Sequence, residues 1–131
     1  MRILVDTHVF LWDLLDDHRS SRKAREILSS DEYQLYFSLV SIWEIAIKMK
    51  TGKLNALGST VSYIRYEMEE YGMELLPIRY EHILQLERLP LHHSEPFDRL
   101  LIAQAVALRT IPHPLPSFDY AQHRQRMGHP F

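Results

Sequence analysis

The fold class is decided by residues 33–52, which read YQLYFSLVSIWEIAIKMKTG. Residues 33–37 are aromatic and apolar, which is typical of a buried strand. The helical pattern that begins near Ser41 should end near Gly52, since glycine readily takes the left-handed conformation found just after helices. A strand followed directly by a helix is the unit from which α/β domains are built.

The same alternation extends in both directions along the chain. Toward the N-terminus, an apolar strand at residues 3–5 precedes helical spacing at residues 9–15, and Ser20 or Ser21 could cap a further helix. Residues 1–131 are therefore predicted to form a single α/β domain, whose parallel sheet is covered by helices on both faces. Toward the C-terminus, we expect helices at residues 60–71, 80–89 and 97–108 and a strand at residues 75–78.

The segment after Thr110 departs from this alternation. Pro112, Pro114 and Pro116 occupy alternate positions, and each lacks the backbone N–H group that a sheet uses. Because alternate N–H groups of a strand point to the same side, this segment could pair along one side only. The prolines therefore predict a strand at the sheet edge or an extended loop.

Composition excludes several function classes. The 131 residues include 17 acids against 15 Lys and Arg, and the resulting net charge of −2 excludes a uniformly basic nucleic-acid coat. The absence of cysteine excludes a disulfide scaffold, a zinc–cysteine site and thiol catalysis. No apolar run approaches the length of a signal-peptide core or a membrane helix, so we expect a soluble, cytoplasmic protein without a membrane partner.

Four acids lie where the predicted topology could bring them together. Asp6 ends the first strand, at the carboxyl edge where open parallel sheets place their sites. Glu44 and Asp98 fall in the first turns of two predicted helices, the second of which is opened by Pro96. Asp119 follows the proline-rich segment.

Each acid taken singly also has a structural explanation. Asp6 could cap the helix that follows it. Ser41 and Glu44 fit the S-x-x-E capping box, in which the glutamate only satisfies a backbone N–H group. Asp98 near a helix N-terminus gains about 0.5 kcal/mol from the helix dipole, and Asp119 could belong to a turn.

Taken together, the four acids favour a metal centre. Two carboxylates about 4 Å apart repel each other by about 4 kcal/mol at an effective dielectric constant near 20, unless one is protonated or a cation lies between them. Oxygen ligands without cysteine are typical of Mg²⁺ or Mn²⁺ sites, which engage phosphate and lower the pKa of a bound water. The sequence spacing alone leaves open whether the four acids converge.

Three motifs resemble those of PIN-domain proteins, and within them the VapC-like ribonuclease toxins of prokaryotic toxin–antitoxin pairs. The motifs are LVDTH at residues 4–8, SLVSIWEIA at residues 38–46 and LPLHHSEPFDR at residues 89–99. The second and third are specific in combination, and the resemblance covers nearly the whole chain. Two features depart from the family pattern: the prolines before Asp119, and Ser94-Glu95 where the family often has Arg-Asp.

The resemblance implies a three-layer α/β/α sandwich with a parallel sheet and an endoribonuclease that uses Mg²⁺, with Mn²⁺ as a substitute. Asp6, Glu44 and Asp98 match the acidic positions of the family, and Asp119 fits its [ST]-x-D pattern. Asp6 and Asp98 would hold the principal metal, with Asp119 completing that shell. Glu44 would position a second metal or the attacking water. Cleavage of the RNA would leave a 3′-hydroxyl and a 5′-phosphate.

The resemblance also implies partners. The usual partner is a small cognate antitoxin protein that binds near the active site, and homodimers are common. The apolar stretch at residues 9–15 is a candidate contact surface, although burial in the core explains it as well. For Trp43, packing in the core or in a dimer is favoured over stacking on a base.

Three further residues are candidates for contact with the substrate. Arg99 could bind a substrate phosphate or pair with a neighbouring acid. Thr7 and Ser41 could bond to the carboxylates or to metal-bound waters, or could simply cap helices. The basic groups around Lys50 and Arg22 could contact the RNA backbone, but cations near a helix end also have a structural explanation.

The runner-up interpretation is a catalytically inactive PIN-like module that binds RNA or protein. A phosphohydrolase with an aspartyl nucleophile at Asp6 is a further alternative. It normally needs a second acid two residues on, where this chain has His8. A related metallonuclease acting on DNA, or processing RNA, stays open.

Overall fold

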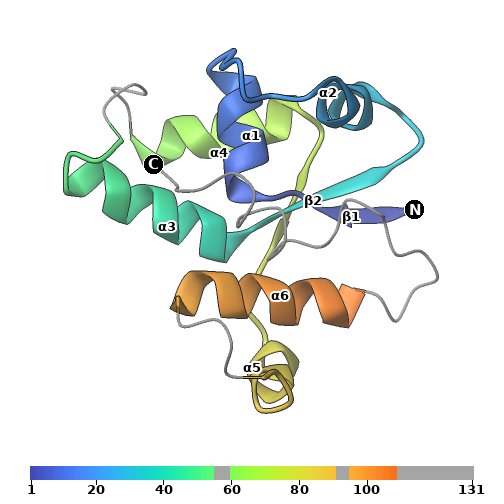
Figure 1. Cartoon of the computed structure of the whole chain (residues 1–131), viewed down its shortest axis with the longest axis vertical. Coiled ribbons are helices and arrows are strands. Elements are labelled where there is room, and N and C mark those ends of the chain that lie inside the picture. Colours follow the sequence, from blue (N-terminus) through green and yellow to red (C-terminus); the bar gives the residue numbers. More distant parts are fainter. Residues whose placement is uncertain (55–59, 91–94, 109–131) are drawn as a thin grey trace.

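The computed structural model describes residues 1–54, 60–90 and 95–108. In these residues, strands β1 (Arg2–Leu4), β2 (Gln34–Ser38) and β3 (Glu74–Leu76) form one parallel sheet in the order β1-β2-β3 (Figure 1). The three strands predicted from the sequence are confirmed, with bounds shifted by one or two residues. Residues 112–116 and Asp119 lie outside the described residues.

Helices alternate with these strands as expected. α1 (Thr7–Leu14) follows β1, and α2 (Arg22–Ser29) begins where the Ser21 hydroxyl accepts a hydrogen bond from the Ala24 N–H group at 3.0 Å. Gly52, with a φ of +79°, lies two residues beyond the end of α3 and confirms the predicted helix end. The other described helices are α3 (Leu39–Lys50), α4 (Val61–Glu70), α5 (Tyr80–Leu86) and α6 (Pro96–Leu108).

The sheet lies between two layers of helices, which confirms the three-layer α/β/α architecture. α5 and α6 cover one face, and α1, α2 and α4 lie on the other (Figure 1). The side chains of residues 3–5, in β1 and just after it, alternate between the two faces: Ile3 and Val5 join the core beneath α1 to α4, whereas Leu4 joins the core beneath α6. A sheet buried on both faces needs such apolar strands, because neither face meets water.

The apolar stretch at residues 9–15 belongs mainly to the core. Phe10, Leu11 and Trp12 are buried, and the Phe10 ring packs on the Phe37 ring of β2 with centroids 4.7 Å apart. Burial therefore explains this stretch, with only Leu15 at its end exposed. No helix within the described ranges is long and apolar enough to cross a membrane.

The start of α3 differs from the prediction. The capping box at Ser41 and Glu44 is wrong, because α3 begins at Leu39 and its N-cap is Ser38. The Ser38 hydroxyl accepts a hydrogen bond from the Val40 N–H group at 2.9 Å, so the chain turns into the helix directly at the end of β2. Glu44 consequently lies in the second turn of α3 rather than in the first.

Candidate functional site

Asp6 connects β1 to α1 and caps that helix. Its Oδ1 atom accepts a hydrogen bond from the His8 N–H group at 3.2 Å, which confirms the capping interpretation. The His8 ring is buried, and its Nδ1 atom lies 3.8 Å from the same Oδ1 atom. Oδ2 of Asp6 is buried as well. Capping thus uses one carboxylate oxygen, and the other is held at the carboxyl edge of the sheet.

Glu44 is completely buried, with 0% of its surface exposed. It lies in the second turn of α3, between the core residues Ile42 and Ile45. A charged carboxylate at such a position is costly unless hydrogen bonds, a cation or a proton compensate for the lost water. This cost is why Glu44 is a stronger functional candidate than an exposed glutamate of the same helix would be.

Asp98 lies in the first turn of α6, as the sequence predicts. Its Oδ1 atom is buried. The neighbouring Arg99 donates a hydrogen bond from Nη1 to the Pro90 carbonyl oxygen at 2.7 Å, which ties the start of α6 to the end of the segment after α5. Arg99 is thus the sequence neighbour of Asp98, and the Pro90 carbonyl oxygen orients its guanidinium group.

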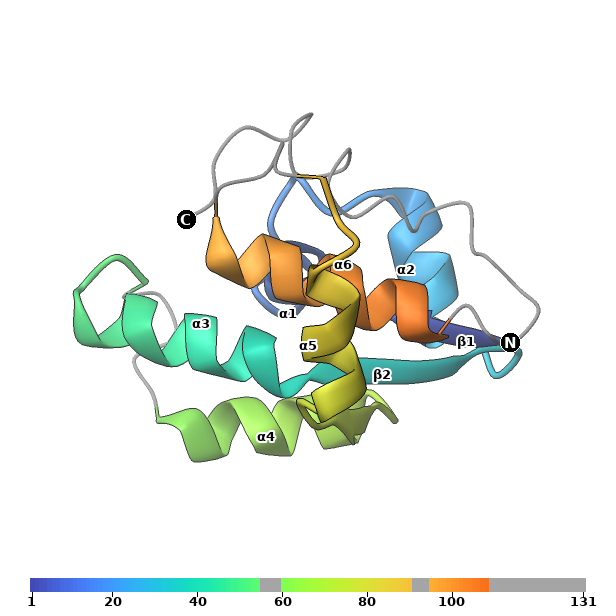
Figure 2. The ribbon, with the colours of Figure 1, turned by 90° about the horizontal axis from the view of Figure 1, so that it is seen from below.

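Two side-chain contacts join the helices that carry these acids. The hydroxyls of Thr7 in α1 and Ser41 in α3 lie 2.5 Å apart, and both residues are 0% exposed. The rings of Trp43 in α3 and Phe97 in α6 meet edge to face, with centroids 4.8 Å apart. Figure 2 shows α3 and α6 side by side. One contact thus joins the neighbour of Asp6 to Ser41, three residues before Glu44, and the other joins the neighbours of Glu44 and Asp98.

The donor set of this region suits a hard divalent cation. Asp6, Glu44 and Asp98 offer only oxygen ligands, and each has a buried carboxylate oxygen. Within the described residues, no three His, Asp or Glu side chains are close enough together to surround a metal ion. Mg²⁺ does not require such a cage, since it usually keeps several waters and takes one or two carboxylates together with substrate phosphate. The residues present therefore fit Mg²⁺ or Mn²⁺.

A buried polar network holds α6 against the sheet. The Ser38 hydroxyl donates a hydrogen bond to Oε1 of Gln104, a fully buried residue in the middle of α6. Nε2 of Gln104 donates to the Pro77 carbonyl oxygen at 3.2 Å and lies 3.4 Å from Nδ1 of His82. That same Nδ1 accepts a hydrogen bond from the Arg79 N–H group at 2.9 Å. The network thus links α6, the helix that contains Asp98, to the start of α3.

The sequence reasoning missed this network and the place of His8 beside Asp6. One signal for the network was present, because Gln104 interrupts the apolar run of α6 and is flanked by Ala103 and Ala105. A polar side chain on the buried face of a helix needs a partner, which indicates a buried hydrogen bond. The partners themselves lie far away in sequence, so local patterns could not identify them.

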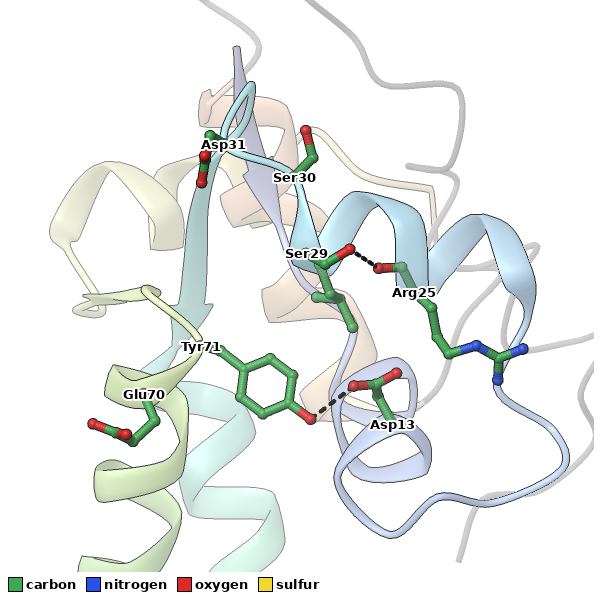
Figure 3. Close-up of a pocket in the computed structure, with 8 residues that line it drawn as sticks. Asp13, Arg25, Ser29, Ser30, Asp31, Glu70 and Tyr71 are labelled. Atoms are coloured by element: carbon green, nitrogen blue, oxygen red, sulfur yellow. Dashed lines mark hydrogen bonds between the residues drawn. The ribbon is translucent and has the colours of Figure 1, made fainter.

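An open pocket of about 670 Å³ lies elsewhere, among α1, α2 and α4 (Figure 3). In it the Tyr71 hydroxyl donates a hydrogen bond to Oδ2 of Asp13 at 2.7 Å. Burial, together with this hydrogen bond, raises the pKa of Tyr71 well above its usual range. Asp13 is near the end of α1, whereas Asp6 is at its start. The pocket contains none of the site residues predicted from the sequence.

The fold is a three-layer α/β/α domain with a parallel sheet, and Asp6 lies at the carboxyl end of its first strand. The PIN domain family matches residues 3–124, and the chain belongs to this family. No curated protein and no solved structure matches the chain. PIN domains are generally nucleases, which are hydrolases, and they generally use divalent metals.

The buried network predicts a pH dependence of stability. Burial lowers the pKa of His82 below its usual 6.5, and the nearby Arg79 charge acts in the same direction, while Glu81 opposes it. As the pH falls, the unfolded chain therefore takes up a proton at His82 at a higher pH than the folded chain does. The free energy of unfolding should therefore fall as the pH drops below about 6.5.

His82→Asn tests this prediction, since the asparagine Oδ1 atom can still accept the Arg79 N–H group. Urea denaturation at pH 7 and pH 5 should show a smaller loss of stability for the variant than for the wild-type chain. An equal loss in both chains would show that another group is responsible.

Proposed function

We propose that this PIN-domain protein is a metal-dependent endoribonuclease and that it acts as the toxin of a toxin–antitoxin pair. One observation carries the proposal: α3 contacts both α1 and α6, and Asp6 at the start of α1, Glu44 in α3 and Asp98 in α6 each have a buried carboxylate oxygen. Membership in a family of nucleases supports hydrolysis of a phosphodiester. The resemblance of residues 38–46 and 89–99 to VapC-like toxins supports RNA as the substrate.

In this proposal Asp6 and Asp98 would hold the principal Mg²⁺ or Mn²⁺, and Asp119 would complete its ligands. Glu44 would position a second cation or accept a hydrogen bond from the attacking water at a carboxylate oxygen. The bound cation would neutralise charge on the phosphodiester and lower the pKa of a bound water. The oxygen of water would bond to phosphorus in line with O3′, the P–O3′ bond would break, and O3′ would take up a proton, which leaves a 3′-hydroxyl and a 5′-phosphate.

The residues around the acids have supporting roles in the proposal. The buried Thr7–Ser41 contact fixes the start of α1 against α3, and we propose that it thereby holds Asp6 and Glu44 in their relative positions. Arg99 donates from Nη1 to the Pro90 carbonyl oxygen, and we propose that its guanidinium charge attracts a substrate phosphate. We further propose a cognate antitoxin protein and a second copy of the chain as partners, on the strength of the family resemblance.

A catalytically inactive PIN-like module that binds RNA or protein is the second candidate. The observation that favours it is the absence, among the described residues, of three metal-ligating side chains around one point. Such a module would bind its ligand and leave RNA intact in the presence of Mn²⁺.

Cleavage of a fluorescently labelled single-stranded RNA tests the enzyme directly. We expect cleavage with Mn²⁺ or Mg²⁺ and none with EDTA. Asp6→Asn and Asp98→Asn should each lower the rate by about 100-fold or more, because losing even a residue that only supports a metal ligand costs about 10- to 100-fold.

The matched control is Asp31→Asn, which removes an exposed carboxylate from the pocket of Figure 3. This variant should retain full activity. Full activity in both Asp6→Asn and Asp98→Asn would contradict the assignment, and an intact substrate in all chains would favour the inactive module.

The toxin role is tested by expression in a prokaryotic host. Induction of the wild-type chain should arrest growth, and co-expression of the protein encoded by the neighbouring gene should relieve the arrest. Asp6→Asn, at the same expression level, should allow normal growth. Normal growth under confirmed expression of the wild-type chain would contradict the toxin role, whatever the RNA assay shows.

A further inference from the structure

The outward face of α3 carries an exposed apolar stripe. Leu39, Trp43 and Ile47 are spaced by four residues, so they share one face of the helix, and their exposed fractions are 39%, 51% and 38%. Half of a tryptophan surface is a large apolar area to leave in water, because its full burial is worth several kcal/mol. We call these three residues, together with Lys50, the Trp43 face.

The exposed charged side chains of α3 and of the turn after it are positive. Between residues 39 and 54 the one acid is Glu44, which is fully buried, and the exposed charged side chains are Lys50 and Lys53. Lys50 is seven residues beyond Trp43, so the α-helical rise places the two about 10 Å apart along the same face. A ligand that covers this face must combine apolar surface with negative charge.

Among the described residues, the two most exposed aromatic side chains besides Trp43 lack this combination. Tyr66 in α4 is 57% exposed, but it is followed by Glu67, Glu69 and Glu70. Tyr80 in α5 is followed directly by Glu81. These acids repel a polyanion, so α4 and α5 do not offer an equivalent surface.

Trp43 is also fixed in place beside the acidic site. Its ring meets Phe97 edge to face with an interplanar angle of 82°, and Phe97 immediately precedes Asp98. Glu44 immediately follows Trp43. A half-exposed aromatic ring of α3 therefore contacts α6, and the two residues in contact are sequence neighbours of Glu44 and Asp98.

We propose that the Trp43 face binds a single-stranded segment of the RNA substrate next to the cleaved bond. One unpaired base stacks on the Trp43 indole, and Lys50 and Lys53 pair with flanking phosphates. This inference rests on the proposed function for the choice of RNA as ligand. Because every base has an aromatic face, stacking here adds affinity and position and adds little base preference.

Binding measured without cleavage tests the proposal. A short, unstructured, fluorescently labelled oligoribonucleotide is titrated with protein in EDTA at fixed low salt, and anisotropy gives the dissociation constant. Trp43→Ala should weaken binding by about 5- to 150-fold, the range that loss of one stacked base produces. Trp43→Phe should retain part of the affinity, and Lys50→Glu should weaken binding more at low salt than at high salt.

The matched control is Tyr66→Ala, which removes an aromatic side chain of similar exposure and should change affinity by less than about twofold. An oligonucleotide of abasic residues gives a second control. It should bind the wild-type chain weakly, and it should not distinguish the wild-type chain from Trp43→Ala. Circular dichroism of each variant checks that α3 and the fold are intact.

Equal RNA affinity of the wild-type chain and Trp43→Ala would overturn the proposal. So would a change from dimer to monomer in light scattering with the RNA affinity unchanged, since the face would then be covered by a second copy. A chain that binds RNA through Trp43 without ever cutting it would contradict the proposed cleavage, and the assignment of the Trp43 face as an RNA-binding surface would still hold.

Discussion

The relative position of α3 and α6 depends on one buried hydroxyl group, that of Ser38. It accepts the Val40 N–H group and donates to Gln104, so a single oxygen atom ends β2, caps α3 and holds the middle of α6. Both hydrogen bonds are buried, and leaving a buried polar group without its partner costs about 1–3 kcal/mol. The helices that carry Glu44 and Asp98 are therefore coupled through the sheet rather than placed independently.

This coupling and the parallel sheet together set the positions of Asp6, Glu44 and Asp98. β1 and β2 end side by side, and the chain enters a helix directly after each. The Thr7–Ser41 contact then locks the first turns of α1 and α3 together. Each of Asp6, Glu44 and Asp98 keeps a carboxylate oxygen buried in this region. If a divalent cation binds there as proposed, its charge would offset the cost of burying these carboxylates, and metal binding would then stabilise the fold.

Much of the fold could be predicted from the sequence because its signals are local. The apolar strands, the Ser21 cap and Gly52 each act within a few residues. The start of α3 could not be predicted, because Ser41 and Glu44 fit a capping box locally, whereas the Ser41 hydroxyl contacts Thr7, 34 residues away in sequence. The exposure of Trp43 was missed for the same reason: an apolar residue in an apolar helix resembles core until the packing of α6 is known. Asp119 lies outside the described residues, and its role stays a prediction.

Binding of Mn²⁺ tests the central claim most directly, since it requires neither a substrate nor the correct target RNA. In a titration followed by electron paramagnetic resonance, Mn²⁺ bound to the protein loses the sharp signal of the hydrated ion. The account predicts binding by the wild-type chain and by Asp31→Asn, and affinity lowered by about 10-fold or more in Asp6→Asn and Asp98→Asn. Equal Mn²⁺ affinity in all four chains, or none in the wild-type chain, would contradict a divalent-cation centre at these acids.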